Sequence, residues 1–145
     1  MNNNQEFENK FSMKIDAKLI NEGFARSMVA TFCVQLNPSV SDINDIKTAV
    51  SEAVTNSIVH GYAGKSGEID ILVGIRNNVV YIKISDQGCG IDDIERARQP
   101  FFTTKSKEER SGMGFTLMES FMDTLKVYNN QNGGVTVEMS KEIKV

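Results

Sequence analysis

Glu52 and Asn56 combine a carboxylate and an amide at a spacing of four residues. That spacing places both on one face of a helix, roughly opposite an apolar stripe formed by Ile46, Val50, Val54 and Ile58. A carboxylate accepts a proton from a hydroxyl nucleophile, and an amide oxygen ligates Mg²⁺. The pair therefore suits group transfer, although most charged helix positions simply face water.

A second group with chemical potential is the string DQGCG at residues 86–90, which follows a predicted strand. An aspartate at the end of a buried strand is shielded from water and accepts the exocyclic amino proton of an adenine. Gly88 and Gly90 let the backbone approach a flat ligand, because they carry no Cβ. The alternative is a turn that opens with Asp86, since this pattern alone is a weak signal.

A third group is the string RSGMGF at residues 110–115, which leads directly into a predicted helix. Glycines before a helix N-terminus expose backbone N–H groups that bind anions, and Arg110 adds positive charge. A flexible, glycine-rich helix entry is the alternative. The sequence has neither a Walker A motif nor the motif set of protein kinases, so a nucleotide would be held in another way.

The stretch between the two glycine loops contains Thr103, Thr104 and Lys105. Hydroxyl and cationic residues in such a place are typical of a lid that covers phosphates. Phe101 and Phe102 are interpreted as packing anchors, the usual role of paired aromatic residues.

The elements that must position these groups follow from periodicity and turn residues. A strand is expected over residues 7–15 and a helix over residues 19–36, which ends before Asn37-Pro38. A second helix, capped by Ser41 or Asp42, is expected to run to about His60. Further elements are strands over residues 69–75 and 79–85 joined by an Asn77-Asn78 turn, a short helix from residue 92, a helix over 114–125, and strands over 125–128 and 135–139.

Composition limits the class of protein. With 145 residues and 40% apolar content, the chain is long enough for one packed domain, and the element order predicts an α+β fold. A net charge of −3 argues against direct contact with nucleic acid, and no apolar run is long enough to span a membrane. Cys33 and Cys89 form no CxxC pair, and the start lacks a leader pattern, so a reduced, cytoplasmic protein is expected.

The order and spacing of the three groups resemble the GHKL ATPase superfamily. Three longer strings, SEAVTN with HGY, RQP with FTTK, and ERSGMGF, resemble its anti-sigma serine kinases over residues 7–139. The resemblance implies a Bergerat, histidine-kinase-like ATPase fold: a two-layer sandwich whose antiparallel-rich mixed sheet is covered by helices on one face. It also implies one domain over residues 1–145, with residues 1–6 frayed and an ATP lid over residues 98–113.

The resemblance assigns roles to individual residues. It implies that Glu52 is the base for a serine hydroxyl, that Asn56 holds Mg²⁺, and that Asp86 binds the adenine amino group. ATP or ADP binding is implied for Asn56, Asp86, Gly88, Gly90, Thr103, Thr104, Lys105, Arg110, Ser111, Gly112, Met113, Gly114 and Phe115. Arg26 and Thr55 match positions that contact protein partners.

The family also implies a function. A homodimer would bind a sigma factor and use Mg-ATP to phosphorylate an anti-anti-sigma protein on serine. The strings favour the sporulation branch, whose partner is sigma factor F. The alternatives are a general-stress anti-sigma kinase, a non-catalytic ATP-dependent sigma-binding module, and a detached histidine-kinase domain, in which Asn would be expected at position 52.

One position departs from the family pattern. The family commonly has Gly-Thr at the start of the last strand, where the hydroxyl supports the adenine site, but this chain has Gly134-Val135 with Thr136 next. A shift of one residue along a strand turns a side chain to the opposite face. Thr136 would therefore take over this role only if the strand register shifted.

Overall fold

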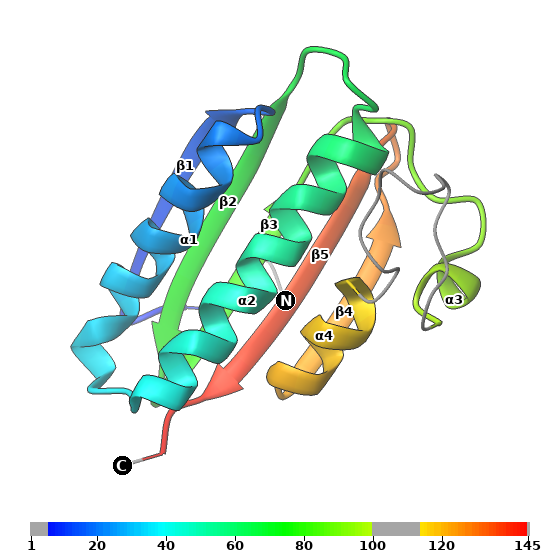
Figure 1. The fold of residues 1–145 in the computed structure, drawn as a ribbon. Coiled ribbons are helices and arrows are strands. Elements are labelled where there is room, and N and C mark those ends of the chain that lie inside the picture. The colour runs from blue at the N-terminus through cyan, green and yellow to red at the C-terminus, as the bar shows by residue number, and fades with distance from the viewer. Residues whose placement is uncertain (1–5, 100–113, 145) are drawn as a thin grey trace.

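The computed structural model describes residues 6–99 and 114–144 and has two layers (Figure 1). A five-stranded sheet has the order β1-β2-β3-β5-β4, and α1, α2 and α4 lie on one of its faces. The strands are β1 (Asn9–Asp16), β2 (Glu68–Arg76), β3 (Val79–Ser85), β4 (Thr124–Asn129) and β5 (Val135–Glu142). The helices are α1 (Ile20–Cys33), α2 (Val40–Asn56), α3 (Ile94–Ala97) and α4 (Gly114–Phe121).

The sheet confirms the predicted α+β class with helices on one face. Where a mixed sheet was expected, all strand pairings are antiparallel in the part of the chain that the structure describes. The turn at Asn77-Asn78 is confirmed, because both residues have positive φ, 51° and 63°, as a tight hairpin turn requires. The helix predicted to reach residue 125 ends at Phe121, because Thr124 already pairs with Ser140 in the sheet.

The core lies between the sheet and the helices. Side chains alternate between the two faces of a strand, and the positions of β2 and β3 that face the helices are apolar and buried. They are Ile69, Ile71, Val73, Ile75, Val80, Ile82 and Ile84. They belong to one core cluster with Ile46, Val50 and Val54, the stripe of α2 that the sequence predicts. Each fully buried aliphatic side chain contributes roughly 1.5–3 kcal/mol, so this layer holds α2 firmly on the sheet.

The contacts at its two ends explain why α2 begins and ends where it does. The cap is Ser39 rather than the predicted Ser41 or Asp42, because Ser39 has an extended backbone and its Oγ accepts a hydrogen bond from Asp42 N at 3.0 Å. At the other end the chain widens into a π-turn over Ser57–Gly61, closed by a bond from Tyr62 N to Ser57 O at 2.9 Å. Such π-turns often occur at functional sites.

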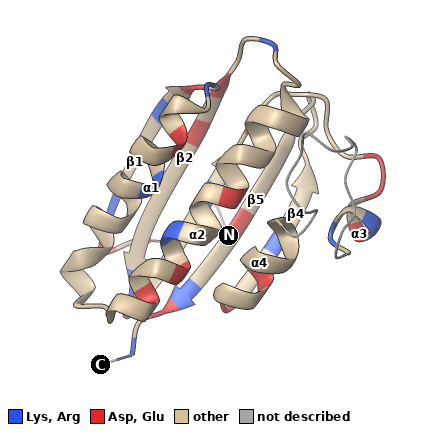
Figure 2. Cartoon of the chain, in the orientation of Figure 1, with Lys and Arg blue, Asp and Glu red and all other residues tan. Residues whose placement is uncertain are grey.

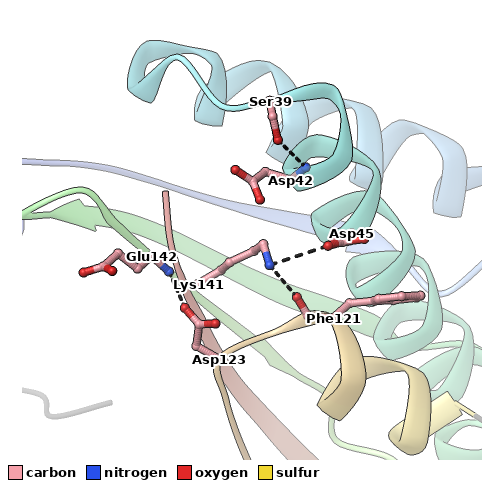
Figure 3. Close-up of polar contacts among 7 residues, drawn as sticks. All are labelled: Ser39, Asp42, Asp45, Phe121, Asp123, Lys141 and Glu142. Atoms are coloured by element: carbon pink, nitrogen blue, oxygen red, sulfur yellow. Dashed lines mark hydrogen bonds and ion pairs between the residues drawn. The ribbon is translucent and has the colours of Figure 1, made fainter. Parts of the chain in front are cut away.

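The N-terminal half of α2 is tied to the end of α4 by Lys141 of β5 (Figure 3). Lys141 Nζ donates to the carbonyl oxygen of Phe121 at 2.8 Å and lies 3.6 Å from Asp45 Oδ2. A cation on the last carbonyls of a helix is favourable, because these groups carry partial negative charge. Beside it, Glu142 N donates to Asp123 Oδ2 at 2.6 Å. These contacts make this end of the molecule an anchor for both helices.

Charged side chains of both signs are interspersed over the elements in the view of Figure 2. This mixture and the net charge of −3 differ from the basic stripe typical of nucleic-acid-binding proteins. Among residues 6–99 and 114–144, no helix is long and apolar enough to cross a membrane.

Candidate functional site

The C-terminal half of α2 presents Glu52 and Asn56 to the first residue of α4. Glu52 is only 7% exposed, so the alternative of a solvated face is wrong for this carboxylate. A Cβ at Gly114 would lie 3.2 Å from Glu52 Oε2 and 3.1 Å from Asn56 Nδ2. Gly114, the first residue of α4, belongs to the third predicted group, residues 110–115. It therefore lies close to Glu52 and Asn56, which form the first group.

Asp86 lies beyond the end of β3 and is 3% exposed. Its Oδ1 accepts hydrogen bonds from Gly88 N at 2.9 Å and Val135 N at 3.2 Å. Its Oδ2 accepts a hydrogen bond from Ser57 Oγ at 2.7 Å. The backbone is held as well, because Asn130 Nδ2 donates to Asp86 O at 2.9 Å. Asp86 is therefore a buried carboxylate whose orientation is set from several sides.

The loops around Asp86 approach one another so closely that glycine is required. A Cβ at Gly88 would overlap the carbonyl oxygen of Gly61, and a Cβ at Gly134 would overlap that of Asp86. Gly134 also has a φ of 90°, which L side chains rarely adopt. The close approach predicted for Gly88 is therefore to protein backbone.

Thr136 lies on the opposite face of the sheet from Asp86, because the register of β5 has not shifted. Ser85 pairs with Thr136 in the register of β3 and β5, and their hydroxyls lie 2.8 Å apart. Val135 lies one residue earlier, so its side chain is on the face of Asp86 and Thr136 is on the other face. Thr136 is linked to the Asp86 backbone only through Asn130. Its Oγ1 donates to Asn130 Oδ1 at 2.6 Å, and Asn130 Nδ2 donates to the carbonyl oxygen of Asp86.

Several predicted ATP-binding residues lie outside the described part of the chain. They are Thr103, Thr104, Lys105, Arg110, Ser111, Gly112 and Met113, with most of the predicted lid. Gly90 has a φ of 78° and so needs the freedom of glycine. The side chain of Phe115 is buried in the core.

The two predicted partner-contact residues differ in exposure. Arg26 is exposed on α1, and its guanidinium lies 3.4 Å from Glu22 Oε1, one helical turn away. This ion pair restricts the orientation of the Arg26 side chain. Thr55 is only 3% exposed, so its side chain lies beneath the surface that a partner would touch.

Sequence reasoning missed Ser57 and Tyr62. Tyr62 OH accepts a hydrogen bond from Gln87 N at 2.9 Å and donates to Glu68 O, so it joins the Asp86 loop to β2. The predicted helix to about His60 includes Ser57, whereas Tyr62 lies in the loop predicted after Gly61. Both roles depend on contacts with the Asp86 loop, which is distant in sequence, so no local pattern could have found them.

The two thiols have different environments. Burial raises the pKa of Cys33 to about 12, so this thiol stays protonated and unreactive at neutral pH. Cys89 is exposed in the Asp86 loop, and both cysteines are free. Elsewhere, burial and the hydrogen bond to Glu138 raise the pKa of Tyr128 on the uncovered face of the sheet.

The donors at the site suit Mg²⁺ better than a metal that needs several protein ligands. Within the described ranges, no group of three or more His, Cys, Asp or Glu side chains could hold a metal ion. Mg²⁺ keeps several waters and substrate phosphates as ligands, so one amide or carboxylate oxygen can be enough. Asn56 supplies such an oxygen beside the start of α4.

The one-faced antiparallel sheet, with a buried aspartate after β3 and a glycine at the start of α4, defines a recognised class of domain. Residues 15–141 match the family model described as a histidine kinase-like ATPase domain. Anti-sigma F factors of Thermoanaerobacter sp. (strain X514) and Clostridium acetobutylicum are 51% and 47% identical to the chain. The first alignment covers 95% of this chain and 96% of the relative, and the second covers 93% and 94%. The chain therefore belongs to the anti-sigma F factor family of histidine kinase-like ATPase domains.

Solved structures confirm the predicted fold. The RsbU and RsbW domains of a Mycobacterium tuberculosis protein align with a TM-score of 0.67 at 18% identity, over 93% of this chain and 32% of that one. The catalytic domain of the histidine kinase ThkA aligns with a TM-score of 0.61 at 19% identity, over 96% of this chain and 97% of that one. At these identities the likeness concerns the fold alone.

Proposed function

We propose that this chain binds Mg-ATP, transfers the γ-phosphoryl group to a serine of an anti-anti-sigma protein, and binds a sigma factor. The observation that carries the proposal is the position of Gly114 close to both Glu52 and Asn56, whose side chains lie within 3.1–3.3 Å of where its Cβ would stand. It brings a helix N-terminus, a buried carboxylate and a hard oxygen ligand to one place. Phosphoryl transfer needs such groups for positioning and charge stabilisation.

Each residue has a defined task in this proposal. Asp86 accepts a hydrogen bond from the adenine amino group and fixes the base. Asn56 holds Mg²⁺, which, when bound, neutralises charge on the phosphate oxygens. Glu52 accepts the proton of the serine hydroxyl late in the transfer. The buried position of Glu52 beside Gly114 favours a kinase over a non-catalytic module, since ATP binding alone needs no base there.

The partners follow from the relatives. Proteins named anti-sigma F factor match nearly the whole chain, which favours sigma factor F over a general-stress sigma factor. The exposed Arg26 is the proposed partner contact, and Thr55 would take part only through a change in its surroundings.

A homodimer is part of the proposal. Ile20, Phe24 and Met28 lie one turn apart on α1 and are exposed, Phe24 by 53%. An exposed apolar row on a helix marks an interaction surface. β1, next to α1, is an edge strand of the sheet, so a second copy can approach both elements. Phe24→Asp should shift the chain to monomer in sedimentation velocity, whereas Lys18→Asp, a charge change at an exposed position just before α1, should leave the dimer intact.

The experiment that tests the function is incubation of the chain with γ-³²P-labelled ATP, Mg²⁺ and an anti-anti-sigma protein from the same genome. We expect label on the partner, released as phosphoserine by acid hydrolysis. ATP binding without transfer would reduce the function to a sigma-binding module. Label on histidine would instead indicate a histidine kinase.

A further inference from the structure

The hydrogen bonds of the Asp86 carboxylate leave one acceptor position open. An ionised carboxylate has about four acceptor positions, two on each oxygen. Gly88 N and Val135 N occupy those of Oδ1, and Ser57 Oγ occupies one position on Oδ2. Among residues 6–99 and 114–144, no further donor fills the remaining position on Oδ2.

Gly61 restricts the direction from which that donor approaches. A Cβ at Gly61 would lie 3.1 Å from Asp86 Oδ2, 3.2 Å from Cγ and 3.2 Å from Oδ1. These nearly equal distances show that the side of Gly61 on which a Cβ would stand faces a flat side of the carboxylate. A ligand donor therefore meets the open position of Oδ2 near the carboxylate plane, where hydrogen bonds to sp² oxygens are favoured.

Ser57 stands where the regular backbone of α2 passes into the π-turn, and its Oγ donates to Asp86 Oδ2 at 2.7 Å. At the other end of the turn, Gly61 O accepts a hydrogen bond from Cys89 N at 2.8 Å. The π-turn that follows α2 thus contacts both the carboxylate and its loop. Both donors to Oδ1 are backbone N–H groups, whereas the donor to Oδ2 is the side-chain hydroxyl of Ser57.

From this arrangement we propose that Ser57 is a positioning residue that makes the site selective for 6-aminopurine nucleotides. The serine hydroxyl that donates to Oδ2 adds to the two backbone donors on Oδ1 in fixing the rotation of the carboxylate, and it leaves one acceptor position for the base. The adenine amino group satisfies that acceptor, and a base without the amino group leaves it unpaired in a buried place. This inference rests on the proposed adenine site at Asp86 and adds the residue that orients it.

The test is competition binding with ATP and purine riboside 5′-triphosphate, which lacks only the 6-amino group, against a fluorescent ADP analogue. The wild-type chain should prefer ATP by about 10- to 100-fold, the range for a hydrogen bond to a charged group. Ser57→Ala should reduce this preference by at least about threefold. Ser57→Cys, which keeps the volume with a weaker donor, should reduce it as well, and Ser57→Thr, which keeps the hydroxyl, should retain it.

The matched control is Ser140→Ala. Ser140 is also a buried serine with a hydroxyl contact, to Thr124, but it lies on the other face of the sheet. This variant should keep the wild-type preference even if its melting temperature falls. A general loss of stability would weaken the binding of both nucleotides equally, whereas a change in the orientation of the Asp86 carboxylate would weaken the binding of ATP selectively.

Two outcomes would overturn the inference in distinguishable ways. If wild type prefers ATP and Ser57→Ala and Ser57→Cys prefer it equally, Ser57 does not set the selectivity, and the proposed function is unaffected. If wild type binds neither nucleotide, the proposed function fails and this inference fails with it.

Discussion

The two ends of α2 use polar residues in different ways. At the N-terminal end, Ser39 caps the helix and Asp45 lies beside Lys141, so its polar groups serve the packing of α2 against α4. At the C-terminal end, Glu52 and Ser57 are buried beside Gly114 and Asp86, residues of two other predicted motifs. One end holds the fold, and the other brings together groups suited to bind and transfer a phosphoryl group.

This difference shows how the helix serves two purposes. α4 runs beside α2, with its last carbonyl held by Lys141 at the anchored end and its first residue against Glu52 at the site end. The two helices are thus joined through Lys141 at one end and lie close together beside Glu52 at the other. We therefore expect changes at the site end to alter chemistry, and changes at the anchored end to alter stability.

The largest effect is expected for Glu52→Gln. Removing the base should lower phosphoryl transfer to the anti-anti-sigma protein by about 10²–10⁴-fold, while ATP affinity stays within about threefold. The matched control is Asp45→Asn, the same kind of change at the anchored end, which should retain transfer. Single-turnover kinetics with labelled ATP measures both, and equal rates for Glu52→Gln and wild type would remove Glu52 from the mechanism.

The next effect is expected for Gly88→Ala. A Cβ at this position overlaps the Gly61 carbonyl, so the Asp86 loop must move and ATP affinity should fall by more than about tenfold. Gly64 is the control, because it has a φ of 85° and no neighbour within 4 Å of a Cβ. Gly64→Ala should cost about 1–2 kcal/mol of stability with unchanged ATP affinity. Calorimetric titration and thermal unfolding separate the two results.

Lys141→Met should have a smaller effect, and on stability only. It removes the bond to the Phe121 carbonyl and the contact with Asp45, which should cost about 1–3 kcal/mol. The comparison variant is Lys144→Met at an exposed position after β5, with an expected change within about 0.5 kcal/mol. Urea unfolding measures both, and a loss of ATP affinity in Lys141→Met at low temperature would contradict a purely structural anchor.

The smallest effect is expected for Ser39→Ala, which removes the N-cap of α2. The expected cost is about 1 kcal/mol. Ser41→Ala, inside the first turn and exposed, is the control and should be neutral or slightly stabilising. If both variants have the same unfolding midpoint in urea, the cap does not stabilise α2.

Local patterns predicted much of this molecule. Helical and alternating periods located α2, β2 and β3, and Asn77-Asn78 marked the hairpin, because these signals lie within short stretches. The motifs also pointed to Glu52 and Asp86. Such patterns could not predict contacts between segments that are distant in sequence. Two examples are the position of β5 between β3 and β4 and the burial of Glu52 near α4.

Ser57 shows the limit most clearly. Its neighbours follow a helical pattern, so the sequence predicts a regular helix to about His60 and indicates no functional role for Ser57. The π-turn forms where Gly61 meets Cys89 of a loop distant in sequence. The role of Ser57 follows from its contact with Asp86, a residue distant in sequence, which the local pattern does not contain.

The most direct test of the account is a crystal structure of the chain with Mg²⁺ and a non-hydrolysable ATP analogue. We predict that the adenine amino group lies within hydrogen-bond distance of Asp86 Oδ2 and that Asn56 Oδ1 ligates Mg²⁺ near the start of α4. The anchored end, with Lys141 on the Phe121 carbonyl, should be unchanged. A nucleotide that binds without touching Asp86, or a metal held away from Asn56, would contradict the assignment of chemistry to the C-terminal end of α2.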